Sequence, residues 1–237
     1  MYEASSLPAS FDDGAVLLID KPKGATSFDV VKAVRGRVGP SKVGHAGTLD
    51  PLATGLLIIL VARPATRLQE AFMHLPKAYE GTMRLGEHTP SLDAETEVEE
   101  RADISHLSFD DLVAARDHFT GQIDQVPPMY SAVKVEGEPL YKKARRGETV
   151  DRAPRQVRID TFELRDWQPP DLTFAVHCSK GTYIRSLARD MGAALDVGAH
   201  LTALRRTAIG EYQAADAWSL PALTDALSEA TTDTDEA

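Results

Sequence analysis

One stretch of the chain combines the residue types of a reactive loop. Residues 42–55 read K-V-G-H-A-G-T-L-D-P-L-A-T-G and run directly into an apolar segment. The glycines allow a tight turn or a close approach of the backbone to a ligand. Asp50 stands at the end of this turn, and a carboxylate on a loop that a rigid strand presents is a common arrangement for a catalytic group. The stretch therefore predicts that Asp50 is a candidate catalytic residue.

The same residues also allow a purely structural interpretation. An Asp followed by a Pro is a good helix start, with Asp50 as the N-cap and Pro51 at the first helical position. Gly55 argues against a long helix there, and His45 alone is compatible with an ordinary loop histidine. Both interpretations stay open on these residues, so the case for chemistry depends on the rest of the chain.

Composition limits the class of protein. The 237 residues are enough for one large domain or two small ones, and 43% hydrophobic with 26% charged residues fits an ordinary globular protein. No apolar run is long enough to span a bilayer, and the N-terminus lacks the basic and apolar parts of a signal peptide. The single cysteine, Cys178, cannot form an internal disulfide and lies in an alternating apolar run, which predicts a buried thiol. A cytoplasmic location without a membrane anchor is expected.

Charge is unevenly distributed along the chain. The net charge of -10 at first argues against a nucleic-acid partner. Acidic residues, however, concentrate in residues 87–100 and 216–237, whereas Lys and Arg concentrate in residues 134–158, with a further basic pair at Arg205 and Arg206. A basic face on an acidic protein can still bind phosphates, although a solvated charged loop fits the composition equally well.

Apolar periodicity predicts the elements that position these residues. Alternation and short apolar runs predict strands at residues 15–20, 56–61, 77–85, 157–164 and 172–177. Helical spacing predicts helices at residues 27–38, 64–74, 108–119 and 183–195, and residues 139–146 fit a short basic helix or a loop. Residues 199–206 fit a turn or a short strand, and the acidic block at residues 87–100 fits a surface hairpin or loop.

This order of elements favours an α+β fold, with a mixed, largely antiparallel central sheet flanked by helices, over a doubly wound parallel sheet. The sequence holds no Gly-rich phosphate-binding motif, no His-Glu-x-x-His and no Cys/His cluster, so we expect neither a metal nor another cofactor.

Six separate stretches resemble a single family. In chain order they are L-L-I-D-K-P-K-G-A-T-S-F-D, K-V-G-H-A-G-T-L-D-P-L-A-T-G-L-L, K-A-Y-E-G-T-M-R-L-G, Q-V-P-P-M-Y-S-A-V-K, C-S-K-G-T-Y-I-R-S-L-A-R-D and G-A-H-L-T-A-L-R-R-T-A-I-G. In this order and spacing, over residues 14–212, they resemble the bacterial tRNA pseudouridine-55 synthases of the TruB family. The resemblance implies the pseudouridine synthase fold and the isomerisation of one uridine in the T-loop of tRNA, with no cofactor.

The resemblance also implies roles for single residues. Asp50 matches the family's nucleophilic aspartate, which can stabilise or trap the positive charge that develops on the ribose when the glycosidic bond breaks. Arg185 matches the arginine that pairs with this aspartate and keeps it ionised. Tyr79 matches the active-site tyrosine that stacks on the base and is the candidate for moving a proton.

The remaining matches concern binding. Tyr183 and Leu204 match residues that line the base pocket, a role that is compatible with ordinary core packing. Lys21 belongs to the K-P motif that supports the catalytic loop. His45 matches the residue that fills the space left by the flipped uridine, whose extrusion costs roughly a few kcal/mol.

The resemblance predicts a division of the chain and a partner. We expect a flexible tail at residues 1–13, a catalytic domain at residues 14–214 and an acidic tail at residues 215–237 in place of a PUA domain. A basic RNA-gripping insertion at about residues 134–158 is expected to be disordered or displaced without RNA and to order on binding. The expected partner is the T-arm of tRNA, bound by a monomer without an obligatory protein partner.

Two alternatives to this function are a tRNA-binding and tRNA-folding chaperone on the same fold and a guide-RNA-dependent synthase. The second would need protein partners.

Overall fold

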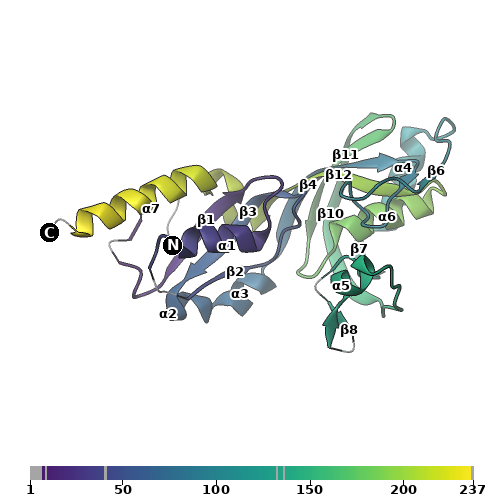
Figure 1. Ribbon diagram of the computed structural model, residues 1–237. Helices are drawn as coiled ribbons and strands as arrows, with labels where there is room; N and C mark the ends of the chain where they lie inside the picture. Colours follow the sequence, from purple (N-terminus) through teal and green to yellow (C-terminus); the bar gives the residue numbers. More distant parts are fainter. Residues whose placement is uncertain (1–6, 9, 40–41, 132, 136, 236–237) are drawn as a thin grey trace. The chain divides into compact units, whose positions relative to one another are not determined.

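The computed structural model describes residues 7–8, 10–39, 42–131, 133–135 and 137–235. The chain divides into two compact units: unit 1 comprises Met1–Tyr79 and Leu204–Ala237, and unit 2 comprises Glu80–Ala203. Two strands continue from one unit into the other, β4 (Lys77–Leu85) and β12 (Ala199–Ile209) (Figure 1). Among the described residues, each unit contains part of one 10-stranded sheet and has its own core residues, and each is described separately.

The sheet of unit 1 is built on two apolar strands, β1 (Ala15–Lys21) and β3 (Thr54–Val61). They pair antiparallel from Ala15↔Val61 to Lys21↔Gly55. The order is β14-β1-β3-β12, in which β14 (Trp218–Ser219) runs parallel to β1 and β12 runs parallel to β3. Strand β2 (Val43–Ala46) pairs antiparallel with β3, and β13 (Tyr212–Gln213) pairs with β12. Because all of β3 after Thr54 is buried, this strand forms the centre of the unit.

Helices cover the sheet of unit 1. They are α1 (Ser27–Arg35), α2 (Ala62–Thr66), α3 (Gln69–His74) and α7 (Leu220–Asp235), with a short 3-10 turn at Ala214–Asp216. Helix α1 starts at a capping box in which Thr26 and Asp29 bond each other's backbone N–H, and it ends at Gly36, before the predicted end at residue 38. The single helix predicted at residues 64–74 is two short helices, α2 and α3.

The predicted acidic tail is partly folded. Strand β14 pairs with β1, and Leu223 and Leu227 of α7 are buried, because their spacing places both on the helix face that packs against β1 and β14. Residues 231–235 continue this helix, and residues 236–237 lie outside the described part of the chain, as do residues 1–6 and 9 of the predicted N-terminal tail.

The sheet of unit 2 has the order β12-β4-β11-β10-β7, with β7 (Gly121–Gln125), β10 (Arg155–Gln168) and β11 (Asp171–Cys178). As predicted, β10 and β11 form an antiparallel hairpin around the Pro169-Pro170 turn, and the alternation of β4 buries Tyr79, Met83 and Leu85. Residues 199–206 belong to a strand of 11 residues rather than to a turn. Cys178 is buried, as predicted.

The helices of unit 2 are α4 (Phe109–Asp117), α5 (Leu140–Arg145) and α6 (Ile184–Ala194), and α4 packs against α6. Ser108 and Asp111 form a capping box at the start of α4. Two small hairpins, β5 (Glu87–His88) with β6 (Glu100–Arg101) and β8 (Lys134–Val135) with β9 (Glu138–Pro139), complete the unit. The predicted α+β class with a mixed, largely antiparallel sheet is confirmed.

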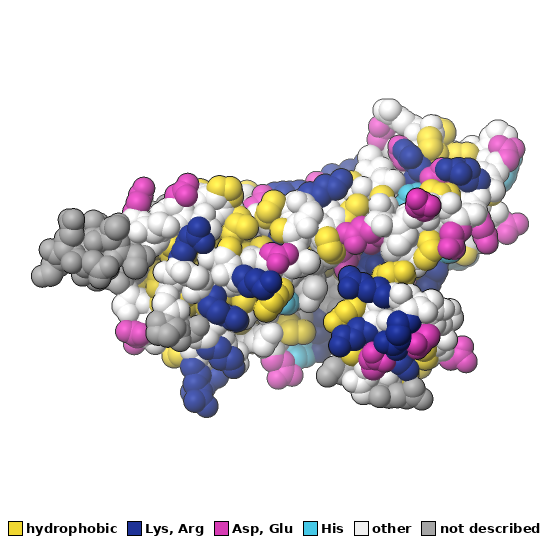
Figure 2. Space-filling view, viewed as in Figure 1, with side chains coloured by type: hydrophobic (Ala, Val, Ile, Leu, Met, Phe, Trp, Pro, Cys, Tyr) yellow, Lys and Arg dark blue, Asp and Glu magenta, His cyan; other side chains and the backbone are white. Residues whose placement is uncertain are grey.

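The described part of the basic insertion combines regular elements with an irregular segment at residues 146–154. Its regular elements include the β8–β9 hairpin and α5, and Figure 2 shows basic side chains interspersed with acidic ones over α5. Arg146, for example, contacts Glu138 and Glu148. The insertion is therefore partly neutralised by its own acids, and its disorder or displacement without RNA remains a prediction, as does its rearrangement on RNA.

Across the described residues, no helix is long and apolar enough to cross a bilayer.

Candidate active site

The Asp50 loop, residues 47–53, joins β2 to β3 in unit 1. It contains no helix: the Asp50 carbonyl accepts a hydrogen bond from the Ala53 N–H at 3.1 Å and closes a turn. The helix-start interpretation of Asp50 is therefore wrong. Leu49 and Leu52 are buried beside the half-buried Asp50, so apolar packing anchors the loop on both sides of its carboxylate.

Lys21 bonds the loop at Pro51. Its side chain is 0% exposed, and its ammonium donates hydrogen bonds to the carbonyls of Ala25 at 2.6 Å, Pro22 at 3.0 Å and Pro51 at 3.4 Å. An ammonium has three donors, and carbonyl oxygens suit its charge. The hydrogen bonds of Lys21 thus join the turn at residues 22–25 to Pro51, the residue after Asp50, as expected for a K-P motif that supports the loop.

The start of α1 holds the residue before Asp50. The Ser27 hydroxyl donates to the Leu49 carbonyl at 3.1 Å and accepts from the Leu49 N–H at 2.8 Å. On the other side, the Gly24 N–H donates to the Pro51 carbonyl at 2.8 Å. Asp50 is therefore flanked by two residues whose backbones are fixed by neighbouring segments.

The other unit 1 candidates lie on strands. Tyr79 on β4 and Leu204 on β12 are both buried. The Leu204 carbonyl accepts a hydrogen bond from the Thr54 hydroxyl at 3.5 Å, which places Leu204 beside the residue that follows the Asp50 loop. His45 lies on β2, directly before the loop, and its carbonyl accepts from the Gln69 side chain at 2.7 Å.

The surroundings of His45 disfavour the protonated form of its imidazole. Burial lowers the pKa of His45 below the usual 6.5, and the positive charge of Arg206 lowers this pKa further. Within the described residues, His45 Nδ1 is buried without a hydrogen-bond partner. A neutral ring with an unused polar atom sits at the edge of the loop.

The shift of His45 gives a testable pH dependence. Because the pKa is lower in the folded state, the unfolded chain binds this proton first, so the free energy of unfolding falls as the pH drops through about 6.5. We expect an NMR titration to give His45 a pKa below 6.5. We also expect His45→Phe to lose less stability than the wild type between about pH 7 and about pH 5. Equal losses in both proteins would contradict the shift.

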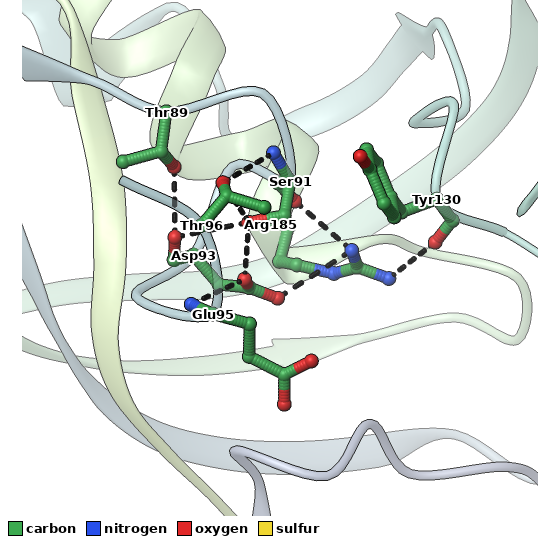
Figure 3. Close-up of polar contacts among 7 residues, drawn as sticks. All are labelled: Thr89, Ser91, Asp93, Glu95, Thr96, Tyr130 and Arg185. Carbon is green, nitrogen blue, oxygen red and sulfur yellow. Dashed lines mark hydrogen bonds and ion pairs between the residues drawn. The ribbon is translucent and has the colours of Figure 1, made fainter. Parts of the chain in front are cut away.

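In unit 2, Arg185 stands in the first turn of α6 and is 5% exposed. Its guanidinium donates to the carbonyl of Ser91 at 3.0 Å and to that of Tyr130 at 2.7 Å, and Nη1 lies 3.5 Å from the carboxylate of Asp93 (Figure 3). Tyr183, the N-cap of α6, donates its N–H to the Gln125 side chain at 2.7 Å. Three segments distant in sequence therefore meet at the start of α6.

Asp93 corrects a prediction from the sequence. The acidic block at residues 87–100 forms the expected hairpin, β5–β6, and Glu95, Glu97 and Glu99 are exposed as predicted, but residues 91–93 are buried and Asp93 is 1% exposed. The Asp93 carboxylate accepts from the Ser91 hydroxyl and from the Glu95 N–H, while the Thr89 hydroxyl donates to the Asp93 carbonyl (Figure 3). These bonds fix the carboxylate that faces Arg185.

The basic pair Arg205 and Arg206 also differs from expectation. Arg205 forms a two-point ion pair with Asp20 at 2.9 and 2.7 Å, and Arg206 is 1% exposed. Neither guanidinium is a free phosphate-binding group. Neighbouring residues of a strand point to opposite sides of the sheet, so Arg205 and Arg206 of β12 have different surroundings.

The predicted site residues fall into the two units. Unit 1 holds Lys21, His45, Asp50, Tyr79 and Leu204, and unit 2 holds Tyr183 and Arg185. The pairing of Asp50 with Arg185 stays a prediction, because the two residues belong to different units. The described residues contain no group of three or more His, Cys, Asp or Glu side chains suited to a metal ion.

Comparison with known proteins shows which family the chain resembles. The profile of the TruB family pseudouridylate synthase N-terminal domain matches residues 35–184, and that of the tRNA pseudouridylate synthase B C-terminal domain matches residues 185–237. The tRNA pseudouridine synthase B of Opitutus terrae is 47% identical over 208 residues, which are 88% of this chain and 86% of the relative. The protein of the same name from Thermobifida fusca is 48% identical over 216 residues, 88% of this chain and 73% of the relative.

A solved Cbf5-Nop10-Gar1 complex contains a chain with a TM-score of 0.69 and 29% identity, and the match covers 95% of this chain and 58% of that one. This chain thus spans a little over half the length of its structural neighbour. The first family profile alone matches more than half of the 237 residues, and the Asp50 and Arg185 motifs lie within the matched regions. The chain therefore belongs to the TruB family of pseudouridylate synthases.

Proposed function

We propose that this protein isomerises uridine 55 in the T-loop of tRNA to pseudouridine. The observation that carries the proposal is the fastened Asp50 loop in a chain of the TruB family. Similarity to relatives named tRNA pseudouridine synthase B, at 47% and 48% identity over 88% of the chain, supports tRNA as the substrate.

The reaction needs a carboxylate in a fixed place. The bond between N1 of the base and C1′ of the ribose breaks, the base rotates, and a bond forms between C5 and C1′. The C5 hydrogen leaves as a proton and N1 gains one, so the product is an isomer of the substrate. Asp50 stabilises or traps the electron-poor intermediate. The bonds from Ser27, Gly24 and Lys21 to its neighbours support this role, because a group that is already positioned needs no reorganisation during the reaction.

Other residues act on the same base in this proposal. Arg185 keeps Asp50 ionised, and Asp93 orients Arg185 by facing its guanidinium. Tyr79 stacks on the base and moves the proton at C5. Tyr183 and Leu204 form walls of the base pocket.

Access to the uridine requires base flipping. Extruding the base costs roughly a few kcal/mol of stacking, which contacts to the RNA must offset. His45 fills the vacated space, and its neutral ring supports this role because a neutral ring is removed from water at lower cost than a charged one. The basic insertion grips the T-arm, and the enzyme works as a monomer without a protein partner, in the cytoplasm where tRNA is found.

The position and the sufficiency of the T-arm are tested together. The purified protein is incubated with an unmodified tRNA transcript and with a T-arm hairpin, and pseudouridine is mapped by carbodiimide modification and primer extension. We expect one new stop, at uridine 55, in both RNAs, and none in transcripts that carry cytidine there. Modification only in the presence of a guide RNA or protein partners would favour the guide-dependent alternative, and stops at other uridines would contradict the assigned target.

A further inference from the structure

Arg206 ties the two ends of the Asp50 loop together. This residue of β12 is buried, and its Nε donates to the Leu56 carbonyl at 2.7 Å while Nη2 donates to the Gly47 carbonyl at 3.0 Å. Gly47 is the first residue of the loop, and Leu56 lies on β3, three residues after the loop ends at Ala53. One buried side chain therefore bonds the backbone on both sides of Asp50.

Two glycines lie against Arg206, Gly47 at the start of the loop and Gly55 on β3, two residues after the loop ends. Gly47 and Gly55 have φ values of +92° and +98°, in the left-handed region. A Cβ at Gly47 would lie 3.5 Å from Nη1 of Arg206, and a Cβ at Gly55 would lie 2.2 Å from its carbonyl oxygen. The backbone on both sides of Asp50 therefore lies in direct contact with Arg206.

The guanidinium of Arg206 forms no ion pair with any described residue. Among the described residues, its guanidinium has no carboxylate within 4.0 Å, whereas neighbouring Arg205 has Asp20. Burying a cation without an anion is costly, and a hydrophobic side chain could fill the same volume at lower cost. What only a guanidinium supplies is a planar set of donors that can reach two carbonyls at fixed angles.

We propose that Arg206 is a positioning residue for Asp50, which fixes both ends of the loop so that the carboxylate is presented in its reactive geometry. The effect on catalysis rests on the proposed function of Asp50. The effect on the order of the loop does not, because it depends only on the two carbonyl bonds.

The test compares Arg206→Lys with Arg35→Lys. Lysine keeps the positive charge but loses the fork of donors. Arg35 is a matched control, since it also donates to a backbone carbonyl of unit 1, that of Val43 at 3.1 Å, but is exposed and bonds no residue of the loop. Both variants are examined by thermal unfolding, by hydrogen exchange at the Leu49 and Ala53 amides, and by steady-state kinetics on tRNA.

For Arg206→Lys we expect about tenfold faster exchange at both amides, whose bonds to Ser27 and to the Asp50 carbonyl depend on the shape of the loop. We expect kcat to fall on the order of 10²-fold with KM within about threefold of the wild type, since a displaced catalytic group affects the reaction more than binding. Arg35→Lys should match the wild type in both measurements.

A lower melting temperature of Arg206→Lys, with wild-type exchange and wild-type kcat, would mark a purely structural role and overturn the proposal. If the variant does not fold, Gly47→Ala replaces it, since it leaves Arg206 in place and disturbs the loop end that Arg206 bonds. Wild-type exchange and kcat in that variant would likewise overturn the proposal. Should the wild type itself form no pseudouridine, the proposed function fails, while the exchange measurements still decide whether Arg206 orders the loop.

Discussion

Replacing Gly55 with alanine is expected to prevent folding or to lower the melting temperature by more than about 10 °C, which corresponds to a loss of about 4 kcal/mol or more. The added Cβ would lie 2.2 Å from the carbonyl oxygen of Arg206 and 2.8 Å from its nitrogen. Both are backbone atoms of a paired strand, so neither can move without breaking the junction of β3 and β12. A φ of +98° is also unfavourable for any residue other than glycine, which adds backbone strain.

Gly121→Ala is the control that separates the steric overlap of an added Cβ from the backbone strain of a positive φ. Gly121 has a φ of +92°, but a Cβ there would meet no atom within 4 Å. We expect this variant to lose only about 1–2 kcal/mol, from the left-handed conformation alone. Thermal unfolding of both variants against the wild type is the measurement. Similar melting temperatures for Gly55→Ala and Gly121→Ala would show that β3 and β12 are not in such close contact.

The second large effect is expected from Asp93→Asn. Asparagine keeps the shape and the acceptor oxygen of Asp93 but removes the charge that faces Arg185, with both side chains almost fully buried. Breaking a buried charge pair by changing one partner costs roughly 3–5 kcal/mol. If Arg185 serves the reaction as proposed, kcat should also fall on the order of 10²-fold, because the guanidinium loses one of the groups that orient it.

Asp171→Asn is the matched control for this change. Asp171 also pairs with an arginine of unit 2, Arg84, at 2.8 Å, but the two side chains are each 37% exposed. Exposed pairs contribute about 1 kcal/mol or less, so this variant should retain nearly full stability and activity. Urea unfolding and kinetics of both variants are compared with the wild type. A loss of stability in Asp93→Asn no larger than in Asp171→Asn would contradict the buried pair.

Local signals made much of the fold predictable. The alternation of residues 77–85 matches β4 at both ends, and the capping boxes at Thr26 and Ser108 mark the starts of α1 and α4. The ends of helices were less accurate. Gly36 ends α1 early, and an acidic, threonine-rich end continues α7 because Leu223 and Leu227 anchor its first turns.

The supports of the site could not be predicted from local signals. Ser91 and Arg185 are 94 residues apart, and Arg206 and Leu56 are 150 apart, so no window of sequence contains both partners. Charge alone was misleading, since it placed Asp93 and Arg206 on the surface, whereas both are buried beside groups that bond them. The turn S-L-D-A-E-T held one usable signal, because an aspartate in a tight turn often accepts a hydrogen bond from the backbone N–H two residues on, as Asp93 does from Glu95.

Dependence of pseudouridine formation on Asp50 is the central claim, and tritium release tests it most directly. Unmodified tRNA carrying uridine labelled with tritium at C5 is incubated with the wild type and with Asp50→Asn, and tRNA binding is measured in parallel. C5 loses its hydrogen only when the new bond to the ribose forms there. We predict release by the wild type and a rate at least about 10³-fold lower for the variant, with both proteins binding tRNA. Equal release by the two proteins would contradict the role of Asp50, and no release by either, with tRNA bound, would mean that the fold serves as a tRNA-binding protein rather than as a synthase.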